Sequence, residues 1–201
     1  VIFGSNLGST TTAWIIAYFG LKVKILIYAM PMIIFGVVLR FSKEIKYKGL
    51  GDVLLGLGFI FLGISYMKEG FETLKSAIDL AAYAVEGYPG ILIYIAIGAI
   101  ATIVIQSSGA TMAIIITALA SNQISYESAL ALTIGANIGT TFTAILASIA
   151  SNENGKRLAF AHLIFNITTA FITVFFLKEI ESFIDLISNY FFAIQKQIKY
   201  F

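Results

Sequence analysis

Long apolar runs separated by short charged stretches dominate this sequence. Three runs, at 25–39, 50–67 and 158–177, approach the roughly 20 residues that a helix needs to cross a hydrocarbon core. A shorter apolar helix is expected over 10–19. Because charged residues cluster between these runs rather than within them, the pattern predicts an all-α polytopic membrane protein.

Two further segments mix charged and apolar residues at helical spacing. Residues 68–86 carry Glu69, Glu72, Lys75 and Asp79 among Phe, Leu, Ile and Val residues, and 178–201 show the same periodicity. Such amphipathic patterns are typical of helices that lie along a membrane surface. We therefore expect an interfacial segment at 68–89 and an amphipathic tail at 178–201.

Residues 87–152 are the most informative stretch, because Glu127 is the single charged residue among these 66 positions. A continuous helix of that length would run about 100 Å, so the chain must fold back. Polar or glycine-rich interruptions occur at 106–109, 121–127 and 135–141. We expect the middle one to be a water-exposed loop. The other two lie within apolar sequence and predict a re-entrant helical hairpin over 90–120 and a broken transmembrane helix at 135–141.

Composition supports the membrane assignment and excludes several classes of protein. The chain is 59% hydrophobic and 12% charged, with 17 Phe and 10 Tyr, so the lipid bilayer is an expected partner. A net charge of +2 is too small for a nucleic-acid binding surface. The absence of cysteine and the single histidine exclude a disulfide framework and a His-rich metal site.

One internal repeat is present. Residues 4–13 (GSNLGSTTTA) match residues 135–144 (GANIGTTFTA) with six of ten positions identical. If residues 68–86 do not span, a count of crossings makes the helices after the two motifs run in opposite directions. Inverted repeats with paired broken helices are typical of secondary transporters. Packing on a small-xxx-small face is the alternative, and it explains the glycines but not the repeated Asn and Thr residues.

The candidate site consists of uncharged groups. Hydroxyl and amide oxygens can replace the hydration shell of a hard cation such as sodium, and helices that restart after Ser108 and after Gly139 would direct N–H groups at an anion. Each helix N-terminus carries roughly half a positive charge, so four of them in two repeats would give about +2, near the charge of hydrogen phosphate. The residues concerned are Gln106, Ser107, Ser108, Thr111, Asn137, Thr140 and Thr141.

The same residues also allow other interpretations. The Gln106–Ser108 segment could be an ordinary loop, His162 a packing residue and Asn166 a helix–helix hydrogen bond. An enzyme is not expected, because neither a base nor an orienting group accompanies Ser107 in the sequence. A non-transporting membrane subunit would use the same glycines for packing and remains an alternative.

Three motifs in this order carry a family resemblance. Gln106-Ser107-Ser108 followed by Ala110-Thr111, then 135–141 (GANIGTT), then 161–166 (AHLIFN), resemble the second half of the type II sodium/phosphate cotransporters. Members of that family have two inverted repeats, each with a Gln-Ser-Ser hairpin. Two differences stand out: Gly109 occupies a position where the family often has a third Ser, and this sequence lacks a first Gln-Ser-Ser hairpin.

The resemblance implies a multi-pass cell-membrane transporter that carries inorganic phosphate by sodium-coupled symport; a sodium-coupled carrier of sulfate or a dicarboxylate is the alternative. We expect an upstream segment of the same protein to supply the first hairpin, and a homo-oligomer is left open. The expected division is 1–19, a broken helix that ends the first repeat; 20–67, two transmembrane helices; 68–89, amphipathic interfacial segment; 90–177, second repeat with hairpin, broken helix and final transmembrane helix; 178–201, amphipathic tail. The expected phosphate ligands are Gln106, Ser107, Ser108, Thr111, Thr140, Ser9 and Thr10, and the expected sodium ligands are Gln106, Ser108, Asn137, Thr141 and Asn6.

Orientation follows from two short basic loops. Crossing counts place the charged clusters at 40–48 and 156–157 on one side of the membrane. The excess of Lys and Arg there favours that side as cytoplasmic.

Overall fold

The computed structural model describes residues 1–22, 25–77 and 87–198. Within these ranges the chain forms eight α-helices and no strand, which confirms the all-α prediction. The helices are α1 (Ile2–Lys22), α2 (Ile25–Arg40), α3 (Ile45–Ala77), α4 (Gly87–Ile105), α5 (Ser108–Ala120), α6 (Tyr126–Ser148), α7 (Glu153–Phe175) and α8 (Leu177–Ile198).

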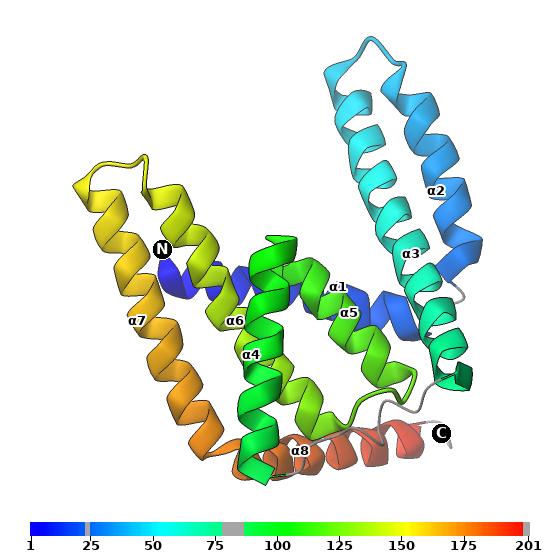
Figure 1. Cartoon of the computed structure of the whole chain (residues 1–201). Coiled ribbons are helices and arrows are strands. Elements are labelled where there is room, and N and C mark those ends of the chain that lie inside the picture. Colours follow the sequence, from blue (N-terminus) through cyan, green and yellow to red (C-terminus); the bar gives the residue numbers. More distant parts are fainter. Residues whose placement is uncertain (23–24, 78–86, 199–201) are drawn as a thin grey trace.

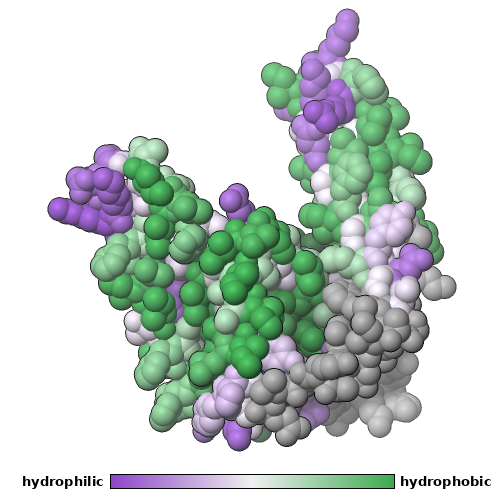
Figure 2. Space-filling model, viewed as in Figure 1, coloured by the Kyte–Doolittle hydropathy of each residue, from purple (hydrophilic) through white to green (hydrophobic). Residues whose placement is uncertain are grey.

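Four of the described helices are long and apolar enough to cross a membrane. They are α3 over Ile45–Gly70, α4, α6 and α7, while α2 and α5 are shorter apolar helices. Large apolar side chains on these helices face outward, for example Leu92 at 63% exposure, Val104 at 75% and Phe171 at 75%. Figure 2 shows this apolar surface over much of the molecule. The protein is therefore a multi-pass membrane protein whose outer face is suited to lipid.

Two helical hairpins, α2–α3 and α6–α7, form arms whose turns lie at the same end of the molecule (Figure 1). Hydrophilic residues gather at both tips (Figure 2). Arg40 pairs there with Asp52 at 3.5 Å, and Lys156 pairs with Glu153 at 3.2 Å. The arrangement agrees with the expectation that the two basic loops share one side of the membrane.

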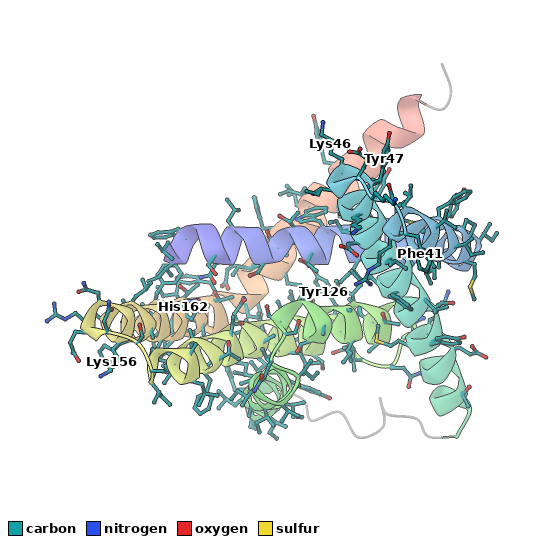
Figure 3. The ribbon with its side chains drawn as sticks, turned by 90° about the horizontal axis from the view of Figure 1, so that it is seen from above. Phe41, Lys46, Tyr47, Tyr126, Lys156 and His162 are labelled. Carbon is teal, nitrogen blue, oxygen red and sulfur yellow. The ribbon has the colours of Figure 1, made fainter. Side chains whose placement is uncertain are left out.

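The helices that carry the repeated motif run in opposite directions. Figures 1 and 3 show α1 and α6 crossing the centre of the molecule with opposite sense. Buried residues of α1, α2, α3 and α5 form one apolar core around Ile16, Phe61 and Ile64. A second core around Ile91 and Ile134 joins α4, α6, α7 and α8.

The predicted helix break at 135–141 is wrong, and so is a break in the first motif. α6 continues unbroken from Tyr126 to Ser148, and α1 runs from Ile2 to Lys22 through the whole motif rather than beginning at Thr10. In an apolar setting, backbone groups freed by a break must find new partners, whereas the continuous helix satisfies them internally. Thr140 and Thr141 also donate their hydroxyl protons to the carbonyls of Ala136 and Ile138, so these polar residues fit within the helix.

The glycines of the second motif serve close packing of α6 against α4. A Cβ atom on Gly135 would overlap the carbonyl oxygen of Ile95, and one on Gly139 would lie 2.6 Å from the carbonyl oxygen of Ala99. Gly98 of α4 is in equally close contact with Leu132. By contrast, a Cβ on Gly4 or Gly8 of α1 would meet nothing within 4 Å. The packing interpretation thus accounts for the glycines of α6 but not for their counterparts in α1.

The remaining predictions concern the hairpin, the loop and the two amphipathic segments. α4 and α5 form the expected helical hairpin, with its turn at Gln106–Ser107. The turn at 121–125 is present, but Ser121 and Gln123 are buried rather than water-exposed. α3 continues through residue 77, residues 78–86 lie outside the described ranges, and α8 makes most of the tail helical.

Candidate substrate site

The turn of the α4–α5 hairpin is an uncharged interruption of helix in apolar surroundings. Gln106 adopts a left-handed backbone conformation with φ of 56°, which ends α4. Ser107 is extended and caps α5, its Oγ accepting a hydrogen bond of 3.2 Å from the backbone N–H of Ala110. Serine is a favoured residue at this capping position, so the sequence specifies where α5 begins.

A buried pair of threonines holds this turn in place. Thr111, 2% exposed, donates its hydroxyl proton to the Ser107 carbonyl at 3.1 Å. Thr102 of α4 is fully buried and donates to the Thr111 hydroxyl at 3.0 Å. Thr111 therefore supports the turn, since its proton is already committed. Sequence reasoning missed Thr102, although it is an isolated hydroxyl in the apolar run of α4.

The first turn of α5 can receive an anion. Helix geometry leaves the N–H groups of Ser108 and Gly109 without intrahelical partners, and the Ser107 and Gln106 side chains are exposed beside them. Because α6 does not restart after Gly139, one such terminus is formed here instead of two. The compensating charge is then roughly +0.5, and cations bound nearby would have to supply more.

α1 borders the hairpin at this point. A Cβ atom on Gly109 would lie 3.1 Å from Cγ2 of Thr12, which belongs to the first repeat motif. Ser9, half-buried on the same helix, donates to the Ser5 carbonyl at 2.9 Å, and exposed Thr10 donates to the Leu7 carbonyl at 2.7 Å. Gly109 thus permits the close approach of α1 where the resembled family often has serine.

The structure joins the asparagines of the two motifs through a third. Asn6 Nδ2 donates to Asn166 Oδ1 at 3.0 Å, and Asn166 Nδ2 donates to the backbone carbonyl of Asn137 at 3.3 Å. Asn166 itself is buried, at 4% exposure, and both hydrogen bonds are partly shielded from solvent. The expected helix–helix role of Asn166 is confirmed, and it connects α1, α7 and α6. We call this set the asparagine bridge.

Two cavities adjoin the asparagine bridge. Cavity A has a volume of about 500 Å³ and includes Ser5, Thr140, Thr143 and His162 in its wall. Cavity B, of about 370 Å³, includes Asn6, Thr10, Asn137 and Asn166. The walls of these two cavities contain neither Gln106, Ser107, Ser108 nor Thr111. Most of the predicted ligands therefore form two groups. The hairpin group lies at the α4–α5 turn and comprises Gln106, Ser107, Ser108 and Thr111. The bridge group lies in the cavity walls and comprises Asn6, Thr10, Asn137 and Thr140.

Thr141, an expected sodium ligand, and His162, an expected packing residue, both lie in surroundings that differ from those expectations. Thr141 is fully buried, donates to Ile138 at 2.6 Å and lines neither cavity. His162, on α7 facing α1 (Figure 3), is 8% exposed and lines cavity A, and its Nε2 has no hydrogen-bond partner among the described residues. Packing alone does not satisfy this nitrogen.

Neutral oxygens are the available cation ligands. The described residues contain no group of three or more Asp, Glu, His or Cys side chains that could hold a metal ion. A monovalent cation with oxygen ligands, such as sodium, is compatible with amide and hydroxyl groups of the kind found here.

Comparison with known proteins places the chain in a family. The model of the Na+/Pi-cotransporter family matches residues 1–69 and 90–195. The uncharacterized protein YqeW of Bacillus subtilis is 29% identical over 191 residues, which cover 94% of this chain and 60% of YqeW. Human sodium-dependent phosphate transport protein 2B is 41% identical over 86 residues, covering 41% of this chain and 12% of the human protein. Rat sodium-dependent phosphate transport protein 2A is 42% identical over 76 residues, 36% of this chain and 12% of that protein.

The chain thus spans about 60% of YqeW and a much smaller part of the mammalian transporters. No solved structure matches it significantly. The family match extends over both copies of the repeated motif, the hairpin turn and the asparagine bridge. This chain belongs to the Na+/Pi-cotransporter family.

Proposed function

We propose that this chain forms part of a secondary active transporter, not an enzyme, that carries inorganic phosphate with sodium across the cell membrane. The observation that carries the proposal is the uncharged turn at Gln106–Ser107, which ends one apolar helix and begins another beside α1. A helix N-terminus with free N–H groups binds an oxyanion without a titrating side chain. Family membership supports phosphate as that oxyanion.

The hairpin group is proposed to bind phosphate. Ser107 and Ser108 offer hydroxyls and α5 offers backbone N–H groups, while the exposed Gln106 amide lies at the same turn. Thr111 fixes the turn through its bond to the Ser107 carbonyl. Ser9, Thr10 and Thr140 are proposed to complete the set when the helices move, since they do not line the hairpin turn in this structure.

The asparagines of the bridge group are proposed to bind sodium. Asn6 uses Nδ2 in its bond to Asn166, which leaves Oδ1 available as a ligand. Asn137 has an exposed side chain in the wall of cavity B. Gln106 and Ser108 are proposed as sodium ligands near phosphate, where a cation would add to the half charge of α5, and Thr141 as a ligand from within α6.

An arrangement of inverted repeats is proposed for the whole protein. α1 would end the first repeat and residues 90–177 would form the second. The opposite sense of α1 and α6 and the shared motif support this division. A second Gln-Ser-Ser hairpin from the same protein would pack on α1, where Gly4 and Gly8 leave room for a helix backbone.

Uptake of radiolabelled phosphate into proteoliposomes of the full-length protein tests the proposal. An inward sodium gradient should drive uptake, and sulfate or dicarboxylates should not compete. Competition by either anion would favour the alternative substrate class. Absence of any sodium-dependent anion flux, with protein that remains monodisperse in detergent, would favour a non-transporting subunit.

A further inference from the structure

Cavities A and B are formed by the same helices but on opposite sides of the asparagine bridge. On α1, the residues that line cavity A end at Ser5 and those that line cavity B begin at Asn6. On α7, the residues that line cavity A end at His162 and those that line cavity B begin at Phe165. On α6, which runs the other way, the lining changes between Thr140 and Asn137. The three changes coincide with the residues that make the bridge. The bridge asparagines, which all line cavity B, therefore lie at its boundary with cavity A.

Cavity A extends toward the basic end of the molecule. Its wall includes Ser151 and Gly155 at the α6–α7 turn, next to Lys156. Cavity B extends the opposite way and reaches Leu177 and Ile180 at the start of α8. Thr143 in cavity A and Thr133 in cavity B stand ten residues apart on α6, a rise of about 15 Å, or roughly half of a hydrocarbon core.

The walls of both cavities are mostly apolar, and the polar side chains among them are uncharged hydroxyls, amides and one imidazole. Neither wall contains an Asp, Glu or Arg side chain, and neither contains Lys. Most of the hydroxyls donate their protons to helix carbonyls three or four residues earlier, so what they offer to the cavity is an acceptor. These hydroxyls belong to Thr140, Thr143 and Ser148 in cavity A and to Thr10, Thr133, Thr169 and Thr173 in cavity B.

While their protons are bound to helix carbonyls, these uncharged acceptor oxygens suit a hydrated monovalent cation. His162 adds a second observation, because its buried Nε2 lines cavity A without a partner. A neutral imidazole nitrogen at that place can accept a hydrogen bond from water in the hydration shell of a cation. The polar groups of the wall of cavity A can thus bind a cation that keeps part of its hydration shell.

We propose that α1, α6 and α7 enclose a sodium pathway, of which cavities A and B are the open parts and the asparagine bridge is the closed constriction. This inference rests on the proposed sodium coupling and adds a route to it. Asn166 acts as a positioning residue, because it draws the asparagines of both motifs together across the route. Opening requires loss of its two hydrogen bonds, and a sodium ion that takes up Asn6 Oδ1 and the Asn137 side chain replaces them.

Single cysteines test the pathway directly, since the chain has no cysteine of its own. Thr143→Cys and Thr133→Cys, in the full-length protein, form a matched pair on one helix. In sealed vesicles, a membrane-impermeant cationic methanethiosulfonate should label Thr143→Cys only from the side of the Lys156 turn and Thr133→Cys only from the opposite side. The cationic reagent should react about tenfold faster than its anionic counterpart. Labelling of both from one side, of neither, or faster by the anion would overturn the proposal.

The role of the bridge is tested with Asn166→Ala in the full-length protein. The measured quantity is the sodium leak, which is the flux of radioactive sodium in the absence of phosphate. Loss of one to two neutral hydrogen bonds should raise this leak roughly tenfold and make Thr143→Cys reactive from both sides. Thr168→Ala, an exposed position two residues along α7 that lines neither cavity, is the control and should leave the leak unchanged. Asn6→Ala removes one bond only and should give a smaller increase if Asn166→Ala does not fold.

An unchanged leak in folded Asn166→Ala would refute the constriction. Failure of phosphate uptake in the parent protein, with opposite-side labelling intact, would instead reject the proposed substrate and leave the cation route in place.

Discussion

At the residue scale, the candidate site depends on small polar side chains, most of whose protons are already committed to hydrogen bonds. The motif Gln106-Ser107-Ser108 was identifiable from the sequence because it interrupts an apolar run. A helix–helix hydrogen bond of Asn166 was also expected, but its partners Asn6 and Asn137 were not identifiable, because they meet it only when α7 lies against both α1 and α6. Thr102 was missed for the same reason: its partner Thr111 faces it only after the hairpin closes. Turns can be predicted from local sequence, whereas contacts between helices can be identified only from the three-dimensional structure.

The conformation of Gln106 permits a sharp test of its amide. Its φ of 56° is tolerated best by Gly and Asn, so Gln106→Asn keeps both the backbone and an amide group. We predict that Gln106→Ala reduces phosphate uptake at least tenfold, whereas Gln106→Asn retains a substantial part. Uptake by both variants is measured in proteoliposomes at equal protein content. Gln106→Gly, which accepts the same φ but has no amide, is the control, and uptake as high as in Gln106→Asn would assign the residue a purely conformational role.

Removal of the cap hydroxyl should act on the same site. Ser107→Ala deletes the acceptor for the Ala110 N–H, which costs about 1 kcal/mol of stability, and it removes a proposed phosphate ligand. We predict strongly reduced uptake with only a small fall in the melting temperature in detergent. Ser125→Ala, which removes the equivalent cap of α6, is the matched control and should retain uptake. Normal uptake in Ser107→Ala would remove this turn from the substrate site.

Sodium activation should separate Asn137 from Thr141. We predict that Asn137→Ala raises the sodium concentration for half-maximal uptake several-fold, because its side chain lies in the wall of cavity B. Thr141→Val keeps the buried shape and removes a hydroxyl, and the same direction is expected if Thr141 binds sodium. Phosphate affinity at saturating sodium should change less in both. An unchanged sodium dependence in Thr141→Val would leave that residue with packing and its bond to Ile138.

At the scale of elements, the sequence predicted helices better than it predicted their continuity. Apolar runs and charged loops indicated the described helices, because a backbone in lipid must pair all its N–H and C=O groups internally and a long helix does so. Residues 135–141 were interpreted as a break because polar and glycine residues interrupt an apolar run there. Close packing against α4, invisible in a linear pattern, keeps α6 whole.

This packing gives a prediction about helix association. Gly139→Leu places a side chain where even a Cβ would lie 2.6 Å from the Ala99 carbonyl oxygen, so it should destabilise the fold by about 1–3 kcal/mol or more. Gly63→Leu on α3, where a Cβ meets nothing within 4 Å, should leave stability nearly unchanged. Thermal unfolding in detergent, followed by size-exclusion chromatography, compares them. Equal melting temperatures would show that α4 and α6 do not pack through these glycines.

At the scale of the whole molecule, the two copies of the repeated motif have unequal surroundings. α6 packs through Gly135 and Gly139 onto α4, whereas the corresponding Gly4 and Gly8 of α1 face no atom within 4 Å. The threonines at the same position of the two motifs also differ. Thr12 of α1 lies against Gly109 of the hairpin, whereas Thr143 of α6 lines cavity A. The unequal surroundings of the glycines disappear if a second hairpin, related to α4–α5, packs on α1 over Gly4 and Gly8.

We therefore predict that residues 1–201 reconstituted alone do not show sodium-driven phosphate uptake, and that a second Gln-Ser-Ser hairpin restores it when supplied as a separate segment. One α5 terminus contributes roughly half a positive charge, and a second would double that where two negative charges must be bound. Gly8→Leu, at a position where an added Cβ would meet nothing within 4 Å, should block the restoration while leaving the 201-residue chain nearly as stable as before. Uptake by the chain alone would contradict this proposal, and restoration by the hairpin despite Gly8→Leu would place the second hairpin on another face.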